Sequence, residues 1–120
     1  MAGNKAKPSV AGVIRLGGRV VTITEIPSSG LDERALGSWD SAQNTILIRG
    51  DLPDTVKVST VLHEITHVGF SGHQSLDSEE TVVLLIETVL SSLFVQNPEY
   101  VRKLVDMVST GKTKSRPAKK

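Results

Sequence analysis

Two early segments of the chain, residues 10–16 and 19–26, are mainly apolar and rich in β-branched side chains. Such composition is typical of strands, and the dipeptide Gly17-Gly18 between the segments is a turn signal. A further β-branched run spans residues 45–49, after a turn expected at residues 37–40. The first half of the chain therefore predicts a hairpin and one more strand.

The pattern changes to that of a helix after Asp54, whose side chain can accept hydrogen bonds from the free amides of a first turn. This helix is expected to end near Gly69, and its apolar stripe is Val58, Val61, Leu62, Ile65 and Val68. Two more helices are predicted over residues 79–96 and from residue 98 to Gly111, the last with Asn97 as its N-cap and Pro98 in its first turn. A short helical turn is also expected over residues 31–36.

These elements predict the α+β class, with a small, mostly antiparallel sheet of about three strands packed on three helices. The helix that begins at Asp54 is expected in the middle. A chain of 120 residues fits one domain. We expect residues 1–9 to be a disordered N-terminus, residues 10–111 to form the domain, and residues 112–120 to be a basic disordered tail.

The composition limits the chemistry that the chain can carry. There is no cysteine, which excludes disulfides and Cys-ligated metal, so a metal site must use histidine and carboxylate ligands. No apolar run reaches the length of a membrane span, and none reads as a signal peptide. We therefore expect a cytoplasmic protein without a membrane partner.

The net charge of +1 hides an uneven distribution. Residues 112–120 hold five basic side chains, and the rest of the chain has nine basic and thirteen acidic residues, a net charge of −4. A basic tail is one signature of nucleic-acid binding. No aromatic residue lies between these charges, so a solvated terminus is the favoured interpretation and nucleic acid is not expected as a partner.

The most informative motif is His63-Glu64-Ile65-Thr66-His67, an H-E-x-x-H pattern inside the first predicted helix. Side chains four residues apart stand on one helical face, with their Cβ atoms about 5–6 Å apart. Two imidazoles placed in this way can both reach one Zn²⁺ ion at about 2.0–2.1 Å. Glu64 lies one step round the helix and is predicted to act as the general base on a zinc-bound water, whose pKa falls to about 7.

A catalytic zinc needs a third protein ligand, and the helix over residues 79–96 offers three glutamates. At about 100° per residue, Glu79 falls near the centre of the apolar face, whereas Glu80 and Glu87 fall toward its edge. A carboxylate in an apolar interface is costly unless it is paired or bound to metal. Glu79 is therefore the predicted third ligand. Glu80 is the alternative, because the start of a predicted helix can be misplaced, and an ordinary first-turn acid is the simpler reading of both.

His73 is a second alternative for the third ligand. His63, His67 and His73 have the spacing of the metzincin signature H-E-x-x-H-x-x-G-x-x-H, but Phe70 stands where that signature has its glycine. His73 is thus a candidate ligand, a candidate donor to a developing oxyanion, or a loop histidine. Tyr100, the single tyrosine, is another candidate donor, and none is preferred.

The order of these pieces resembles small phage- and prophage-type zinc metallopeptidases of the ImmA/IrrE-like group within the gluzincins, over roughly residues 37–105. The resemblance implies a zincin-like domain in which His63 and His67 are zinc ligands, Glu64 is the base and a carboxylate of the next helix is the third ligand. It also implies that the strand at residues 46–48 is the sheet edge to which a peptide substrate adds. The segment from Glu79 to residue 83 lacks the Ala-Asn and aromatic-Ala pairs that relatives often carry there, which leaves the identity of that ligand open.

We therefore expect a zinc-dependent metallopeptidase that hydrolyses a peptide bond in a peptide or protein substrate, with one catalytic Zn²⁺. The alternative is a non-catalytic, metal-containing binding or accessory protein, of phage or prophage origin.

Overall fold

The computed structural model describes residues 9–27, 35–70 and 79–115. Within these ranges the chain forms four strands followed by three helices, so the expected α+β class is correct. The elements in chain order are β1 (Gly12–Leu16), β2 (Arg19–Ile26), β3 (Gly37–Asp40), β4 (Thr45–Arg49), α1 (Asp54–Phe70), α2 (Glu79–Gln96) and α3 (Pro98–Ser115).

The described strands form one mixed sheet in the order β1-β2-β4-β3. The pairs β1–β2 and β3–β4 are antiparallel, whereas β2 and β4 run parallel. The predicted hairpin is confirmed: β1 and β2 meet at Gly17, whose φ of 65° favours glycine. The expected number of strands was wrong, because a fourth strand, β3, pairs outside β4. The pairing is mostly antiparallel, as expected, and the parallel pair β2–β4 is the exception.

The fourth strand is β3, which we expected to be a turn. Asp40 does form a turn, but the turn follows Asp40 and does not include residues 37–39. Oδ1 of Asp40 accepts hydrogen bonds from the backbone N–H groups of Ala42 and Gln43 at 3.0 and 3.3 Å. Asn44 then adopts a φ of 52° and completes the connection to β4. The turn residues thus close a β3–β4 hairpin and leave Gly37 to Asp40 free to pair.

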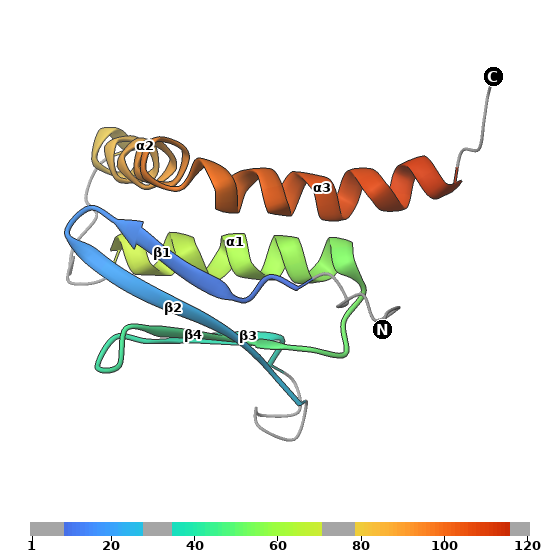
Figure 1. The fold of residues 1–120 in the computed structure, drawn as a ribbon. Helices are drawn as coiled ribbons and strands as arrows, with labels where there is room; N and C mark the ends of the chain where they lie inside the picture. Colours follow the sequence, from blue (N-terminus) through green and yellow to red (C-terminus); the bar gives the residue numbers. More distant parts are fainter. Residues whose placement is uncertain (1–8, 28–34, 71–78, 116–120) are drawn as a thin grey trace.

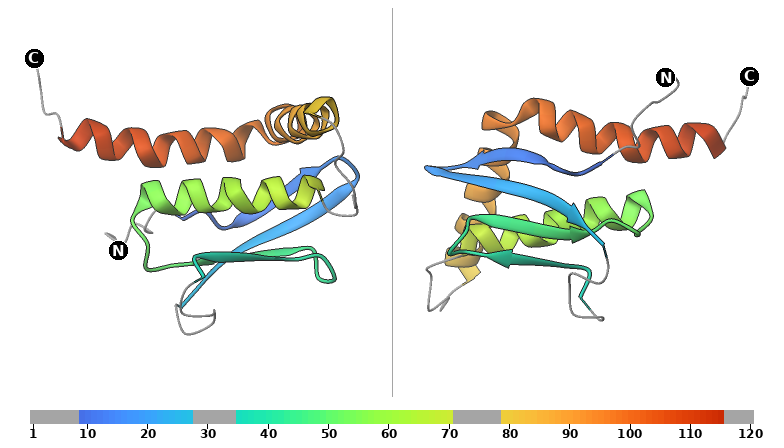
Figure 2. Two further views of the ribbon diagram at one scale, coloured as in Figure 1. Left: turned by 180° about the vertical axis from the view of Figure 1, so that it is seen from behind. Right: turned by 60° about the horizontal axis from the view of Figure 1, so that its bottom comes forward.

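The inner face of the sheet builds the core together with α1. Alternate strand residues point inward and are at most 9% exposed, namely Ile14, Leu16, Val21, Ile23, Ile46 and Ile48. Val13, next to Ile14 on β1, points outward and is 62% exposed. Helix α1 lies between the sheet and the layer formed by α2 and α3, as expected for the central helix (Figure 1). The twisted sheet carries β1 up to that outer layer (Figure 2).

The outer edge of the sheet at β1 is held by side chains from the junction of α2 and α3. Asn97 donates from Nδ2 to the carbonyl of Arg15 at 2.7 Å and accepts the N–H of Arg15 at Oδ1, 2.8 Å away. Tyr100 donates its hydroxyl to the carbonyl of Val10 at 2.5 Å, and Lys103 donates to the carbonyl of Ala11 at 2.6 Å. The side chain of Asn97 therefore binds β1 rather than capping α3, although α3 begins where expected.

The opposite edge is β3, which in the described part of the chain pairs only with β4. The expectation that the strand at residues 46–48 is the sheet edge was therefore wrong: it belongs to β4, which lies between β2 and β3. The physical reason is the order of strand addition: after β2 the chain forms β3 at the outer edge, and β4 then pairs between β2 and β3.

Helix α3 continues past Gly111 to Ser115, so the predicted stop at that glycine was wrong. The helical turn expected over residues 31–36 lies largely outside the described residues, as do residues 116–120 of the predicted tail. In the described ranges no single helix is long and apolar enough to cross a membrane; α2 and Pro98–Ser109 meet that length and composition only as a pair bent by 95°.

Candidate metal centre

The H-E-x-x-H motif lies on α1, whose orientation is set by its apolar stripe. Val61, Ile65 and Val68 are at most 5% exposed and face the core. Leu62, which we placed in the same stripe, is 38% exposed. The core-facing residues turn His63 and His67 outward, and both are exposed. Helical geometry therefore presents the two histidines to solvent on one side of α1.

The two imidazoles lie next to each other, as the spacing predicts. Their ring centroids are 4.9 Å apart and the rings are inclined at 76°. Imidazole nitrogens are ordinary ligands of zinc, and two rings projecting from successive turns can approach one cation together. The side chains of His63 and His67 are thus placed where two imidazoles can approach a single cation.

Glu64 lies on the inner side of the motif and is only 7% exposed. It lines a pocket of about 460 Å³ together with His63, Ser59 and Thr60 of α1 and with Leu36 and Gly37 at the start of β3. A carboxylate and an imidazole of the motif therefore face the same hollow. A group in this position can exchange a proton with a molecule that enters the pocket.

Gly37 allows β3 to lie this close to α1. A Cβ atom at Gly37 would lie 2.9 Å from the carbonyl oxygen of Leu47 and 3.0 Å from Cγ2 of Thr60. Contacts this short are not tolerated without a shift of the backbone or the helix. The pocket is thus formed where the sheet edge approaches the turn of α1 that precedes the motif.

The predicted third ligand does not join the histidines in the described structure. Glu79 is the first residue of α2 and is exposed, and so is Glu80. The buried residues of α2 are Val89 and Leu93, so the argument that places Glu79 on a buried apolar face fails. Among the described residues no three His, Asp or Glu side chains form a group that could hold a metal ion. His73 lies outside the described residues, and the identity of the third ligand stays a prediction.

The structure also bears on the candidate oxyanion donor Tyr100. This side chain is buried, and burial raises the pKa of its hydroxyl. Its O–H group is donated to the carbonyl of Val10 at the β1 edge. Tyr100 therefore has a structural role in the described fold.

The sequence did not point to the pocket residues outside the motif. Ser59 and Thr60 precede His63 by four and three positions, so helical spacing alone was a sufficient signal for them. Leu36 and Gly37 had no such signal, because they come from the sheet edge and meet α1 only in the folded chain.

A second hollow, of about 640 Å³, lies at the end of the β1–β2 hairpin beside Arg19 and Asn44. The guanidinium of Arg19 donates to Oδ1 of Asn44 at 2.9 Å and lies 5.6 Å from the ring centroid of Trp39. The charge of Arg19 is thus engaged by neighbours in the fold, and the hollow next to the motif is the better candidate for chemistry.

The pocket beside the sheet edge is thus lined by the imidazole of His63 and the buried carboxylate of Glu64, and His67 lies next to His63 on the exposed side of α1. No protein-family model, no curated protein and no solved structure matches this chain. The class of protein is therefore inferred from the geometry of the site.

Proposed function

We propose that the chain is a zinc-dependent metallopeptidase that hydrolyses a peptide bond. The observation that carries the proposal is the pair His63 and His67, 4.9 Å apart on the exposed side of α1, with Glu64 buried beside them at the pocket. Two imidazoles and an adjacent carboxylate are the donor set of H-E-x-x-H peptidases. We further propose that the chain is a gluzincin of the ImmA/IrrE-like type that acts in the cytoplasm.

His63 and His67 are the proposed zinc ligands. The third is a carboxylate of α2, for which Glu79 is preferred over Glu80, with His73 as the remaining alternative. A zinc ion bound there would lower the pKa of a water molecule and polarise the carbonyl of the scissile bond. The exposed position of both imidazoles fits this role, because a catalytic zinc needs an open coordination position that substrate can reach.

Glu64 is the proposed general base. Its carboxylate takes a proton from the attacking water and later delivers it to the nitrogen of the leaving amine. Because Glu64 is 7% exposed, few waters compete for its oxygens. His63 lines the same pocket, so the proton acceptor and one metal ligand meet the substrate together.

The substrate is proposed to be an extended peptide that pairs with β3. The β1 edge is covered by Asn97, Tyr100 and Lys103. Among the described strands this leaves β3 as the edge where a further strand can add. Because Gly37 at the start of β3 also lines the pocket, a peptide on this edge passes close to His63 and Glu64.

The test uses the full chain purified without chelator. We expect about one zinc per chain by elemental analysis, and cleavage of a peptide library followed by mass spectrometry. Glu64→Gln should keep the zinc and lose at least about 100-fold in cleavage rate, the usual contribution of a positioned base. Glu87→Gln, an exposed acid on α2, is the matched control and should cleave like the wild type.

Protein that carries no zinc after this purification would contradict the proposal, as would undiminished cleavage by Glu64→Gln. If Glu64→Gln changed nothing while His63→Ala unfolded the zinc-loaded protein, the alternative of a non-catalytic, metal-containing accessory protein would replace it.

A further inference from the structure

Helix α2 exposes far more apolar surface than a helix with one buried face requires. Its inner side is buried at Val89 and Leu93. A second row of apolar side chains, spaced three and four residues apart, runs along the helix beside the buried side. We name this row the α2 stripe, and it consists of Val83, Ile86, Leu90 and Phe94, which are 49%, 40%, 49% and 58% exposed.

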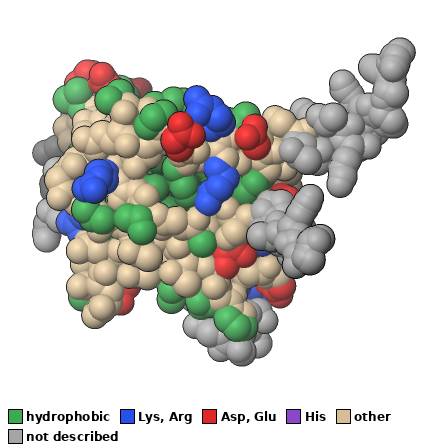
Figure 3. All heavy atoms as spheres, in the orientation of Figure 1, with side chains coloured by type: hydrophobic (Ala, Val, Ile, Leu, Met, Phe, Trp, Pro, Cys, Tyr) green, Lys and Arg blue, Asp and Glu red, His purple; other side chains and the backbone are tan. Residues whose placement is uncertain are grey.

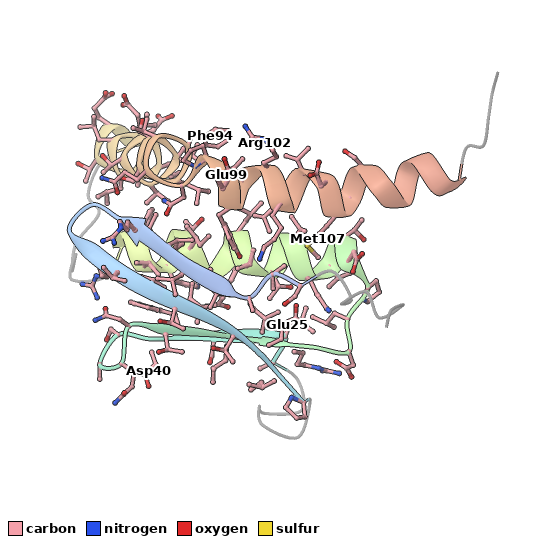
Figure 4. The ribbon with its side chains drawn as sticks, in the orientation of Figure 1. Glu25, Asp40, Phe94, Glu99, Arg102 and Met107 are labelled. Carbon is pink, nitrogen blue, oxygen red and sulfur yellow. The ribbon has the colours of Figure 1, made fainter. Side chains whose placement is uncertain are left out.

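The α2 stripe lies on the outside of the molecule. Figure 3 shows hydrophobic side chains on the surface at the end of the molecule where α2 lies, and Figure 4 shows Phe94 on the side of α2 that faces away from the sheet. Leu84 and Val95 flank the stripe and are 53% and 77% exposed. A half-exposed aliphatic or aromatic side chain presents on the order of 80 Å², so these six present roughly 500 Å² of apolar surface.

A patch of this size has the dimensions of one half of a protein interface. The largest apolar patch on a typical monomer covers roughly 300–600 Å² and is often functional. Together with its polar margins, the patch approaches the roughly 800 Å² per partner that a stable interface buries. We propose that the α2 stripe is the interface of a homodimer, in which it packs antiparallel against the same stripe of a second copy of this chain.

The order of residues in the stripe favours an antiparallel partner of the same sequence. When the helix is reversed, Phe94 lies opposite Val83 of the second copy and Ile86 lies opposite Leu90. The largest side chain thus meets the smallest, and the two of intermediate size meet each other, which fills the interface evenly. Ser91 on the flank is small and permits a close approach of the two helices.

The charges on α2 point to the same arrangement. Its acids are Glu79, Glu80 and Glu87, and α2 has no Lys or Arg, so a parallel pair would place like charges side by side. In the antiparallel pair, the acidic start of α2 lies opposite the start of α3 in the second copy. That end of α3 carries the positive end of its helix dipole, and the charge of its own acid, Glu99, is compensated by Arg102.

The test measures the oligomeric state of the full chain by sedimentation velocity over a range of concentrations. We expect a dimer that dissociates on dilution. Leu90→Glu should weaken association by about 30-fold or more, as expected for a charge placed in the centre of an interface, and Phe94→Glu should also weaken it, because it places a charge against Val83 of the second copy. Val13→Glu is the matched control: Val13 is 62% exposed on the outer face of β1, so the same substitution there should leave the dimer intact. Far-UV circular dichroism establishes that each variant is folded.

Because the chain has no cysteine, single cysteines report the direction of the helices. In the antiparallel pair, the two copies of position 90 are offset by about 4.5 Å along the axis and those of position 94 by about 16 Å. Leu90→Cys should therefore cross-link efficiently with a short bismaleimide, and Phe94→Cys should not.

A monomer at every soluble concentration would overturn the proposal, and so would a dimer that survives both stripe variants or is lost in Val13→Glu. Equal cross-linking at positions 90 and 94 would overturn the antiparallel arrangement. Sedimentation of a monomer with vesicles of phosphatidylcholine and phosphatidylglycerol, lost in Phe94→Glu, would assign the stripe to a lipid surface instead.

Discussion

At the level of single residues, Glu25 connects three parts of the chain. Its Oε1 atom accepts a hydrogen bond from Nζ of Lys57 on α1 at 2.9 Å. Its Oε2 atom accepts from the hydroxyl of Ser9 at 2.9 Å and from the N–H group of Val10 at 2.8 Å. Figure 4 shows Glu25 between β2 and α1, where it ties the sheet and the N-terminal segment to the motif helix.

These contacts make Glu25 a determinant of stability at low pH. Burial alone would raise the pKa of its carboxyl, but the hydrogen bonds from Lys57, Val10 and Ser9 outweigh burial and lower the pKa below 4.5. The stabilising contribution is therefore fully present above pH 4.5 and is lost as the pH falls through the lowered pKa of the folded state. We expect Glu25→Gln to cost about 3 kcal/mol at neutral pH, because it leaves the charge of Lys57 buried without a partner.

Urea unfolding at several pH values measures this effect. The free energy of unfolding of Glu25→Gln should depend less on pH below 4.5 than that of the wild type. The control is Glu99→Gln, which removes an exposed ion pair with Arg102 and should change stability by less than about 0.5 kcal/mol. Equal losses in the two variants would refute the role assigned to Glu25.

At the level of the elements, the crossing of α1 and α2 depends on Gly69, which has no side chain. A Cβ atom at Gly69 would lie 1.9 Å from Cγ2 of Val89, which is closer than any real contact. The glycine therefore sets how near α2 can lie to the end of α1, only two positions after His67. Gly69 was predicted to end the helix, and α1 does end one residue later, at Phe70; the structure adds the role of Gly69 in helix packing.

Gly69→Ala is expected to destabilise the protein by about 1–3 kcal/mol, because the added methyl group overpacks the crossing. Val89→Ala in the same chain removes the opposing methyl groups and should restore part of the loss. The measurement is a double-mutant cycle on the free energy of unfolding. Gly18→Ala serves as control, since nothing lies within 4 Å of a Cβ atom there. Strictly additive effects of the two substitutions would show that Gly69 and Val89 do not compete for space.

The helices also show where element-level prediction succeeds. Helices α2 and α3 begin at the predicted residues, and α1 begins at Asp54, which was expected to be its cap. A 3.6-residue period acts within one or two turns of chain, so the starts are predictable even though the side chain of Asn97 binds β1. The face that a helix buries is less predictable for α2, which is apolar nearly all round. The elements packed against α2 bury only the side that carries Val89 and Leu93. Glu79 and the α2 stripe therefore stay exposed.

Zinc should stabilise the whole molecule if His63 and His67 hold it in the folded state alone. A ligand at 100 times its dissociation constant adds about 2.7 kcal/mol to the free energy of unfolding. We expect added zinc to raise the thermal midpoint of the wild type, and His63→Ala combined with His67→Ala to abolish the increase. Differential scanning calorimetry with and without zinc measures both.

The same measurement can identify the third ligand. Glu79→Gln should lose most of the zinc-dependent stabilisation, whereas Glu80→Gln and His73→Ala should retain it; a different ranking would move the assignment to the variant that loses most. An identical response to zinc in the variant that lacks both motif histidines would contradict the proposed site itself.

The sequence by itself determined what depends on neighbouring residues. Local periods of two or 3.6 residues and turn chemistry account for the β1–β2 hairpin, for the starts of the three described helices and for the outward pair of His63 and His67. The paired imidazoles needed nothing more than a spacing of four on one helix.

Only the tertiary structure decided the features that join distant parts of the chain. The parallel insertion of β4, the exposure of β3 as an edge, the bond between Glu25 and Lys57, and the pocket between Gly37 and Glu64 each depend on how whole elements pack. No local period encodes such a contact, because its energy comes from burial and hydrogen bonding between segments that meet only after the chain has folded.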